Sequence, residues 1–148
     1  MGLHKKAYGI ILYKVEKKDI KILLCLGVSS DDKWGCLKGS KNKDESAFIC
    51  AKREFFEESS IRVDIALFEE YFEQINPDKD IGIWLVNASN IENIDRFFEK
   101  DSLLKEYLSW ENTKVKYFSL KKLPKIKDMQ KELIKNVKDF LESKSLFH

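Results

Sequence analysis

The chain has 148 residues, of which 43% are hydrophobic and 35% charged, a mixture typical of a globular protein and sufficient for one domain, 1–148, with a sizeable core. Its 27 basic and 25 acidic side chains give a net charge of +2, so charge gives no indication of binding to nucleic acid or to a membrane surface. No apolar run approaches the roughly 20 residues of a membrane span, and we expect no membrane partner.

The first half of the chain predicts two strands and a helix. Residues 7–14 and 20–27 are rich in β-branched or aromatic side chains and are separated by VEKKD, which predicts a hairpin at this position and not a signal peptide. Residues 45–58 follow a lysine-bearing loop and contain no Gly or Pro. They predict a helix with Asp44 as its N-cap.

The second half predicts further strands and a final helix. Residues 62–75 are expected to be extended, 81–87 form a buried strand, and 114–119 alternate as a strand does, whereas 89–108 give no single assignment. Pro124 is expected to open the last helix. Its apolar side chains recur at spacings of three and four: Met129, Leu133, Val137, Phe140 and Leu141. The order of elements indicates a mixed α/β domain.

Cysteine and histidine usage excludes several kinds of site. Cys25, Cys36 and Cys50 show no C-x-x-C spacing, so we expect reduced thiols in a cytoplasmic protein and no zinc site. His4 and His148 lie near the ends of the chain, which argues against a serine or cysteine nucleophile activated by histidine. Catalysis would therefore rest on carboxylates, lysines, tyrosines or a metal.

Three glutamates share one face of the predicted helix, because Glu54, Glu57 and Glu58 are spaced i, i+3 and i+4. Like charges at these spacings repel by about 0.2–0.5 kcal/mol per pair, and anions near a helix C-terminus cost about 0.3–1 kcal/mol more. Arg53 can offset only part of this cost. Hard oxygen ligands on one face suit Mg²⁺ or Mn²⁺, and a solvated acidic face is the alternative.

The other faces of the predicted helix are apolar. Phe48, Ala51 and Phe55 form one arc that should face the core. Ile49 and Phe56 form a second arc, so we expect the helix to be covered on two sides.

The stretch 39–61 resembles the Nudix box, G-x5-E-x7-R-E-U-x-E-E-x-G-U, where U is a bulky apolar residue. One fixed position departs, because Ser60 replaces the second glycine. The matching residues are Gly39, Glu45, Arg53, Glu54, Phe55, Glu57, Glu58 and Ile61. One Gly, four Glu and one Arg at fixed spacing are far more specific than a short glycine motif.

The resemblance implies an α/β/α sandwich with a mixed sheet, a loop–helix–loop metal site and a C-terminal helix. It implies hydrolysis of a nucleoside diphosphate linked to a further group X. Mg²⁺ or Mn²⁺ would bind Glu54, Glu57 and Glu58, joined by the backbone carbonyl of Lys38. The metal would lower the pKa of a bound water, and a carboxylate would take the proton as water attacks phosphorus.

Other residues of the box would be structural by the same resemblance. Glu45 and Arg53 would brace the loop and the helix, and Phe55 would pack under the site. Gly39 begins the motif. The family's second glycine lies where a helix ends and a positive φ is often needed. Ser60 would either adopt that conformation, at about 1–2 kcal/mol, or the loop after the helix would take another route.

Outside the box the chain looks most like the asymmetrical diadenosine tetraphosphate hydrolases. The order GIILYKV, ILLCLG, DKWGCLKG resembles their strand–strand–W-x-x-P-K-G opening, with Leu37 in place of proline, and IGIWLVNAS resembles a later buried strand. SWENTKVKYFSLKKL resembles their S-x-E-x5-W-x-x-L segment, with Tyr117 at the aromatic position. This places Glu111 where the family has a metal ligand or base. An ordinary loop glutamate is the alternative.

Candidate substrate-binding residues are aromatic side chains and lysines. Aromatic faces suit nucleobases, although a core or strand role is commoner for such residues. The aromatic candidates are Trp34, Tyr71, Phe72 and Tyr117. The lysines that would meet phosphates, with a solvated loop as the alternative, are Lys38, Lys41 and Lys43.

We therefore expect a Mg²⁺- or Mn²⁺-dependent pyrophosphohydrolase acting on a small-molecule nucleotide, a dinucleoside polyphosphate such as diadenosine tetraphosphate. The alternative within the same chemistry is a nucleoside triphosphate or the 5′ triphosphate of RNA, the one case with a nucleic-acid partner. A non-catalytic nucleotide-sensing module is the rival, but the four box glutamates favour the enzyme. The general base (Glu57, Glu58 or Glu111), the number of metals, and the choice between monomer and homodimer stay open.

Overall fold

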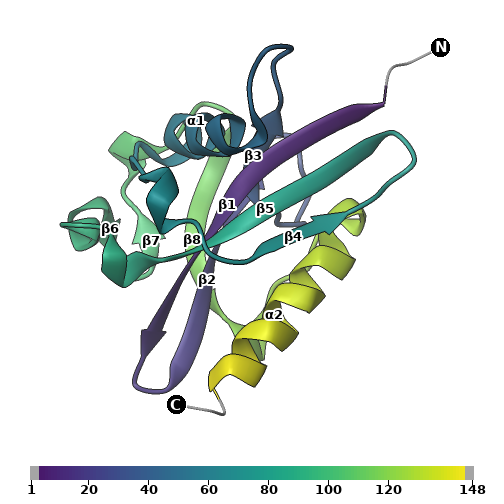
Figure 1. Cartoon of the computed structure of the whole chain (residues 1–148). Helices are drawn as coiled ribbons and strands as arrows, with labels where there is room; N and C mark the ends of the chain where they lie inside the picture. The colour runs from purple at the N-terminus through teal and green to yellow at the C-terminus, as the bar shows by residue number, and fades with distance from the viewer. Residues whose placement is uncertain (1–3, 146–148) are drawn as a thin grey trace.

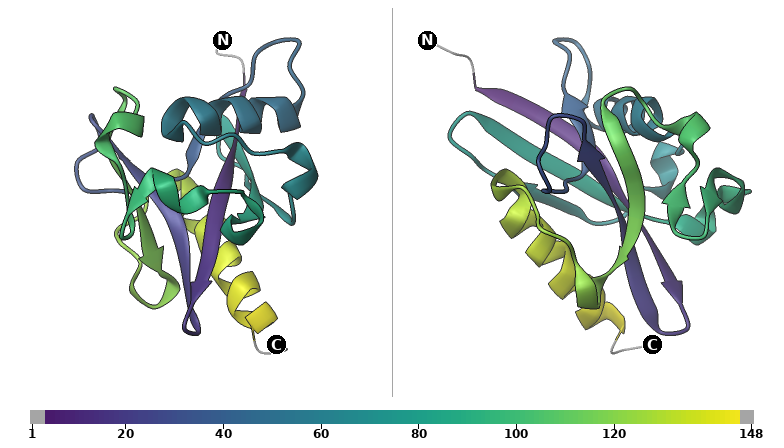
Figure 2. Two further views of the ribbon diagram at one scale, coloured as in Figure 1. Left: turned by 90° about the vertical axis from the view of Figure 1, so that its left-hand side faces the viewer. Right: turned by 180° about the vertical axis from the view of Figure 1, so that it is seen from behind.

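Strand β1, Lys5–Glu16, is an interior strand of the sheet in the computed structural model, which describes residues 4–145. Its side chains alternate between the two faces of the sheet. Ile10 and Leu12 pack beneath helix α1, Ala47–Ser59, whereas Ile11 and Tyr13 pack beneath helix α2, Lys131–Ser145 (Figure 1). Views from two further sides show the helices on opposite faces of the sheet, which confirms the expected α/β/α sandwich (Figure 2).

The sheet is mixed, with the strand order β4-β5-β1-β2-β8-β7-β6 and with β3 paired to β1 outside this path. Strand β1 runs parallel to β5 and antiparallel to β2 and β3. The strand bounds are β2, Asp19–Gly27; β3, Leu37–Ser40; β4, Tyr71–Gln74; β5, Lys79–Asn87; β6, Phe98–Glu99; β7, Ser102–Leu103; and β8, Asn112–Ser119. The predicted hairpin and the strands expected at 81–87 and 114–119 are confirmed.

Helix α1 begins at a different residue from the one expected. Ser46 is the N-cap, and its hydroxyl accepts a hydrogen bond from the amide of Ile49 at 3.2 Å. The prediction of Asp44 as the cap was wrong, because residues 42–45 form a turn in which the amide of Glu45 donates to the carbonyl of Asn42 at 3.2 Å. The helix can begin only after this turn.

One apolar arc of α1 is buried and the other is not. Ala51 and Phe55 are fully buried, as expected, and Phe48 stacks on Trp84 with ring centroids 4.7 Å apart while staying half exposed. Ile49 is 47% and Phe56 36% exposed, so the expectation that α1 is covered on two sides was wrong. The Arg62 guanidinium carbon lies 4.5 Å from the centroid of the Phe56 ring.

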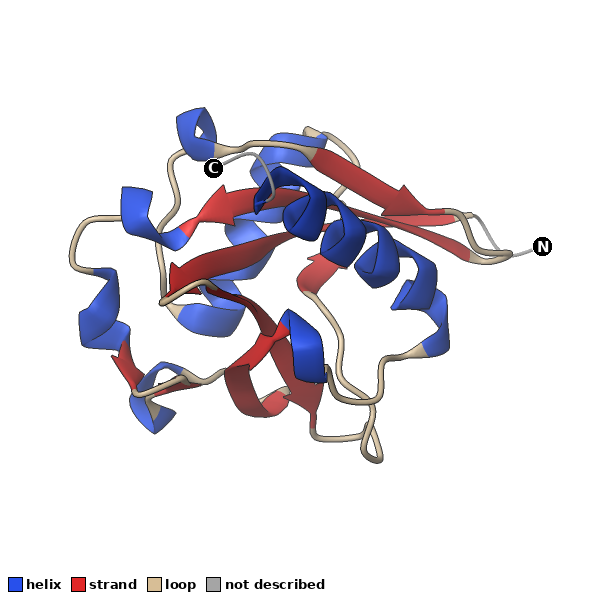
Figure 3. Ribbon diagram, turned by 90° about the horizontal axis from the view of Figure 1, so that it is seen from below, coloured by secondary structure: helices blue, strands red, loops and turns tan. Residues whose placement is uncertain are grey.

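The second half of the chain contains more turns than predicted. A 3-10 turn, Ile65–Leu67, interrupts the stretch expected to be extended, and residues 89–108 hold further 3-10 turns and the short β6–β7 hairpin (Figure 3). Pro124 does not open a helix, because residues 125–127 run extended beside Trp34. Helix α2 follows a 3-10 turn, Asp128–Gln130. Within residues 4–145, no helix has the length and apolar character to cross a membrane.

The apolar face predicted for the last helix is largely confirmed. Leu133, Val137 and Leu141 are buried against the sheet, and Phe140 is partly buried there. Met129 lies in the turn before the helix and is 41% exposed, so its place in the stripe was wrongly predicted.

Candidate metal and nucleotide site

Arg53 joins helix α1 to the loop before it. Its Nε and Nη2 atoms donate to the two carboxylate oxygens of Glu45 at 2.6 and 2.9 Å, and Nη2 also reaches the carbonyl of Ser40 at 3.2 Å. Because Arg53 binds both oxygens, it holds the pKa of Glu45 at about 2. These are the contacts expected of a pair that braces the loop against the helix.

The same guanidinium reaches two of the glutamates on the helix. Nη1 of Arg53 lies 2.8 Å from Oε1 of Glu54 and 3.1 Å from Oε1 of Glu57. Burial raises the pKa of Glu54, whose side chain is 15% exposed, whereas Glu57 is 51% exposed. Arg53 therefore offsets part of the repulsion between two of the three carboxylates.

Gly39 is required by the position of Glu54. A Cβ atom built on Gly39 would overlap the Glu54 carboxylate, so a side chain at residue 39 would displace it. The thiol of Cys50 also donates to the carbonyl of Gly39 at 3.4 Å. The first glycine of the box thus has a steric role that does not depend on a positive φ.

Glu58 is the most buried carboxylate of the helix, at 7% exposed. Its Oε1 accepts a hydrogen bond from Nδ2 of Asn112 at 2.9 Å, but its buried Oε2 has no hydrogen-bond partner within residues 4–145. Burial raises the pKa of Glu58 to about 7, against the lowering effects of the Asn112 hydrogen bond and the charge of Lys38. A buried, unpaired carboxylate oxygen is costly unless a cation or donor completes it.

Glu111 is brought to the helix by the start of β8. Its side chain is exposed, and its charge adds to the effect of burial, which is the main cause of the raised pKa values of Glu54 and Glu58. Its carbonyl accepts from the amide of Val28 at 2.8 Å, which ties this loop to the end of β2. The structure thus places Glu111 within electrostatic range of the box.

The donor chemistry fits a divalent cation, although within residues 4–145 no three His, Cys, Asp or Glu side chains gather closely enough to form a complete metal site. Arg53 donates hydrogen bonds to carboxylate oxygens of Glu54 and Glu57 that could otherwise bind a cation. The unpaired Oε2 of Glu58 is the observation that favours a cation. Carboxylate oxygens are the ligands that Mg²⁺ and Mn²⁺ prefer.

Two features of the site were missed from the sequence. Asn112, 8% exposed, holds Glu58 and could have been noticed only as the neighbour of Glu111.

The second missed feature is Lys79. It lies opposite Lys5 in the parallel β1–β5 register, and its pKa is lowered by burial and by the charges of three lysines. These lysines are Lys38, Lys5 and Lys127. Lys79 and these three lysines, here called the lysine cluster, are linked by the charge that each of the three exerts on Lys79. Lys38 also interacts by charge with Glu58, and Lys79 with Glu54. Such a concentration of positive charge suits a polyphosphate chain.

The aromatic candidates are not gathered at the carboxylates. Trp34 is 9% exposed and meets Phe118 edge-on, at 4.7 Å between ring centroids, on the α2 side of the sheet. Phe72 packs on Phe140 of α2. Their positions support packing and give no support to stacking on a nucleobase.

Tyr71 and Lys41 lie nearer the surface. Tyr71 is 38% exposed, packs on Trp84 at 4.6 Å and donates its hydroxyl to Glu73 at 2.9 Å. Lys41 is exposed, and its ammonium donates to the carbonyl of Asn42 at 3.3 Å. Lys43, also exposed, lies in the same loop.

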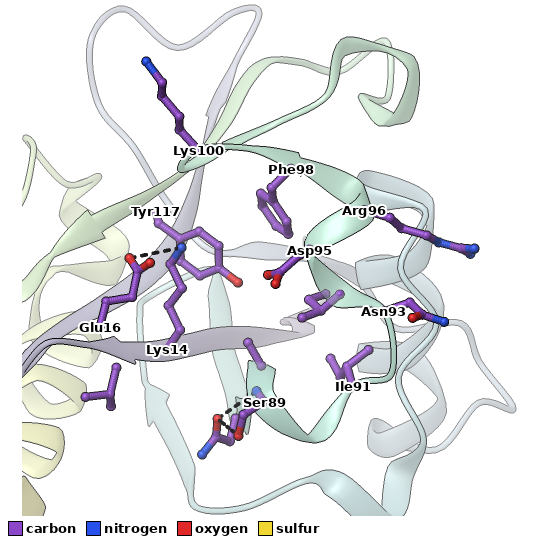
Figure 4. A pocket seen from close by; sticks show the side chains of 14 residues that line it. Lys14, Glu16, Ser89, Ile91, Asn93, Asp95, Arg96, Phe98, Lys100 and Tyr117 are labelled. Carbon is purple, nitrogen blue, oxygen red and sulfur yellow. Dashed lines mark hydrogen bonds and ion pairs between the residues drawn. The ribbon is translucent and has the colours of Figure 1, made fainter.

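Tyr117 lines a cavity of about 930 Å³ that none of the box carboxylates lines. The cavity lies between the end of β1, strand β8 and residues 87–100, and the Tyr117 hydroxyl and the Asp95 carboxylate point into it (Figure 4). The Tyr117 ring is 3% exposed, with the Lys14 ammonium 4.3 Å from its centroid and Phe98 at 4.9 Å between centroids. Tyr117 is therefore a packed residue of this separate cavity.

The two departures from the family pattern are accommodated locally. Ser60 has φ 66° and ψ 8°, so it takes the left-handed conformation of the family's glycine, and its amide donates to the carbonyl of Phe56 at 2.7 Å. Leu37 begins β3 opposite Ile10 and is fully buried. The loop after the helix is therefore not rerouted.

No protein-family model matches the chain. Among solved structures, a C. elegans Ap4A hydrolase binary complex is 21% identical with a TM-score of 0.61, covering 94% of this chain and 98% of that one. The NUDIX domain of Shewanella oneidensis NrtR complexed with ADP ribose is 13% identical with a TM-score of 0.64, covering 95% and 90%. A MutT/nudix family protein from Enterococcus faecalis is 16% identical with a TM-score of 0.59, covering 80% of this chain and 45% of that one. The chain has the Nudix fold, and it spans less than half the length of the E. faecalis protein.

Proposed function

We propose that this chain is a divalent-metal-dependent pyrophosphohydrolase that cleaves a nucleoside diphosphate linked to a further group, with a dinucleoside polyphosphate such as diadenosine tetraphosphate as its substrate. The observation that carries the proposal is the buried, unpaired Oε2 of Glu58, on the helix that also carries Glu54 and Glu57. A second support is the charge of Glu111, which acts on two of these carboxylates.

Each residue of the site has a chemical task in this proposal. Glu54, Glu57 and Glu58, with the Lys38 carbonyl, would hold Mg²⁺ or Mn²⁺, which when bound supplies Lewis-acid charge and lowers the pKa of a water molecule. Glu111 is exposed and would accept the proton of the water that attacks phosphorus, with Glu57 as the alternative base. Asn112 keeps Glu58 oriented.

The lysine cluster would position the phosphates. Lys38 and Lys79 lie close enough to the carboxylates for their charges to interact, so their ammonium groups can neutralise the phosphate oxygens while the carboxylates remain available to the cation. Phosphoryl transfer depends mainly on such positioning and charge neutralisation.

A dinucleoside polyphosphate is preferred because the sequence resemblance outside the box is to enzymes of this substrate, and because an Ap4A hydrolase shares the fold over nearly its whole length. The same groups would serve a nucleoside triphosphate or an RNA 5′ triphosphate.

We also propose that the protein is located in the cytoplasm. Cys25, Cys36 and Cys50 form no disulfide bond, which suits that reducing compartment.

The second candidate is a module that binds a nucleotide without cleaving it. One observation favours it: a NUDIX domain of similar fold is complexed with ADP ribose. The four box glutamates and the unpaired Glu58 oxygen favour the enzyme.

Incubation of the protein with Mg²⁺ and a panel of nucleotides, with the products resolved by chromatography, tests the proposal. ATP and AMP from diadenosine tetraphosphate support it. Release of orthophosphate or pyrophosphate from triphosphorylated substrates would show that the substrate is a nucleoside triphosphate or an RNA 5′ triphosphate. The proposed hydrolytic chemistry would then stand. Absence of turnover across the panel, together with nucleotide binding, would establish the binding module in its place.

A further inference from the structure

Trp110 is an unusual surface residue. It is 84% exposed, whereas the other two tryptophans, Trp34 and Trp84, are 9% and 8% exposed. Tryptophan carries a large apolar ring system and is highly buried on average in folded proteins. An indole kept in water is therefore a candidate for contact with a ligand.

The backbone holds Trp110 in a defined place. The amide of Asn112 donates to the carbonyl of Ser109 at 3.2 Å, and the amide of Glu111 donates to the Ser109 hydroxyl at 3.3 Å, so residues 109–112 form a turn. Trp110 immediately precedes Glu111 and lies two residues before the side chain that binds Glu58. The indole is thus attached to the same short turn that brings Glu111 to the carboxylates.

A second exposed apolar side chain lies beside this turn. Val28 is 57% exposed, and its amide donates to the carbonyl of Glu111 at 2.8 Å. The backbone of Glu111 therefore lies between two residues with exposed apolar side chains, Trp110 before it and Val28 across from it. Both exposed apolar side chains thus flank the turn whose Asn112 side chain binds Glu58.

We propose that Trp110 stacks on a nucleobase of the bound nucleotide. The proposal rests on the proposed function for the place of the phosphates, which would lie at the carboxylates and lysines. A base attached to those phosphates gains affinity from a flat apolar partner, and every nucleobase has a π face that an indole can cover. Stacking of one base on an aromatic side chain corresponds to about tenfold to a hundredfold in affinity.

Binding, and not turnover, tests this subsite. Calorimetric titration with a methylene-bridged ATP analogue in Mg²⁺ compares the wild type with Trp110→Ala and Trp110→Phe. We expect about tenfold to a hundredfold weaker binding for Trp110→Ala and a change below about threefold for Trp110→Phe, which keeps an aromatic face. Methylenediphosphonate, which lacks a base, should bind equally to all three proteins.

A matched control and a spectroscopic readout complete the test. Val15→Ala shortens another exposed apolar side chain, which is 60% exposed and lies near the C-terminal end of β1. This control should leave binding of the analogue unchanged. In the wild type, the ATP analogue should protect the exposed Trp110 indole from quenching by iodide.

The stacking assignment would be overturned if Trp110→Ala weakened binding of the ATP analogue and of the diphosphonate equally. It would also be overturned if Trp110→Ala weakened binding of neither. The two proposals fail separately. Base-dependent binding through Trp110 without any turnover would leave the stacking assignment in place and remove the enzyme.

Discussion

Glu58→Gln separates the two effects expected of a buried metal-binding carboxylate. The glutamine amide has the same shape, and its oxygen can still accept the hydrogen bond that Nδ2 of Asn112 donates at 2.9 Å. The substitution removes the negative charge and replaces the unpaired Oε2 by an amide nitrogen. Stability without metal and response to metal should therefore change in opposite directions.

The magnitude follows from burial. An unsatisfied buried polar group costs about 1–3 kcal/mol, and more when it is charged, so the uncharged amide should equal or exceed the wild type in stability without metal, by up to about 1 kcal/mol. For a chain of this size, about 1 kcal/mol corresponds to about 2–4 °C in melting temperature. Mg²⁺ at a hundred times its dissociation constant should stabilise the wild type by about 2.7 kcal/mol, and the variant should lose this gain.

Thermal unfolding with and without Mg²⁺ measures both effects, and turnover is measured in parallel. Glu92→Gln, which changes an exposed glutamate outside the site, is the control and should keep the metal-dependent rise. Turnover by Glu58→Gln should fall by orders of magnitude. A Glu58→Gln protein that keeps the rise with Mg²⁺ and the turnover would refute the assignment of Glu58 as a metal ligand.

Three further predictions concern neighbouring residues. Gly39→Ala should displace the Glu54 carboxylate and lower turnover at least tenfold, about 1.4 kcal/mol of barrier, while circular dichroism shows an intact fold. Ser60→Gly should relieve the positive φ and raise the free energy of unfolding by up to about 1 kcal/mol in urea titrations, with turnover unchanged; a loss of stability would contradict the strain. Because Arg53 lowers the pKa of Glu45 to about 2, Glu45 stabilises the fold fully above pH about 4.5, and this contribution is lost as the pH falls toward 2. Glu45→Gln should therefore cost about 1–3 kcal/mol at pH 7 and progressively less at lower pH in urea unfolding, and an equal cost at all pH values would exclude the ion pair.

Several features of the site could be predicted because they are local. The spacing of Glu54, Glu57 and Glu58 places them on one helix face in any α-helix, since the period is fixed. The β-branched and aromatic content of residues 7–14 and 20–27 likewise predicted the hairpin that β1 and β2 form. For Ser60, at the end of the helix, the sequence left two alternatives: a left-handed conformation or a loop that takes another route. The structure shows that Ser60 takes the left-handed conformation.

Other predictions failed where local signals compete. Asp44 and Ser46 are both good N-caps, and a turn at 42–45 decides for Ser46. Pro124 is compatible with a helix start or with an extended segment, and pairing beside Trp34 decides for the latter. The exposure of Ile49 and Phe56 depends on which elements pack over α1, which periodicity does not specify.

The sequence by itself determined that Glu54, Glu57 and Glu58 share one face of α1, because the period of an α-helix is fixed. Only the tertiary structure decided which of these groups is buried and what completes it. The hydrogen bond between Glu58 and Asn112 joins residues 54 positions apart, and the Lys5–Lys79 pair depends on the parallel register of β1 and β5. Burial and long-range pairing follow from strand order and packing, which no fixed period along the chain encodes.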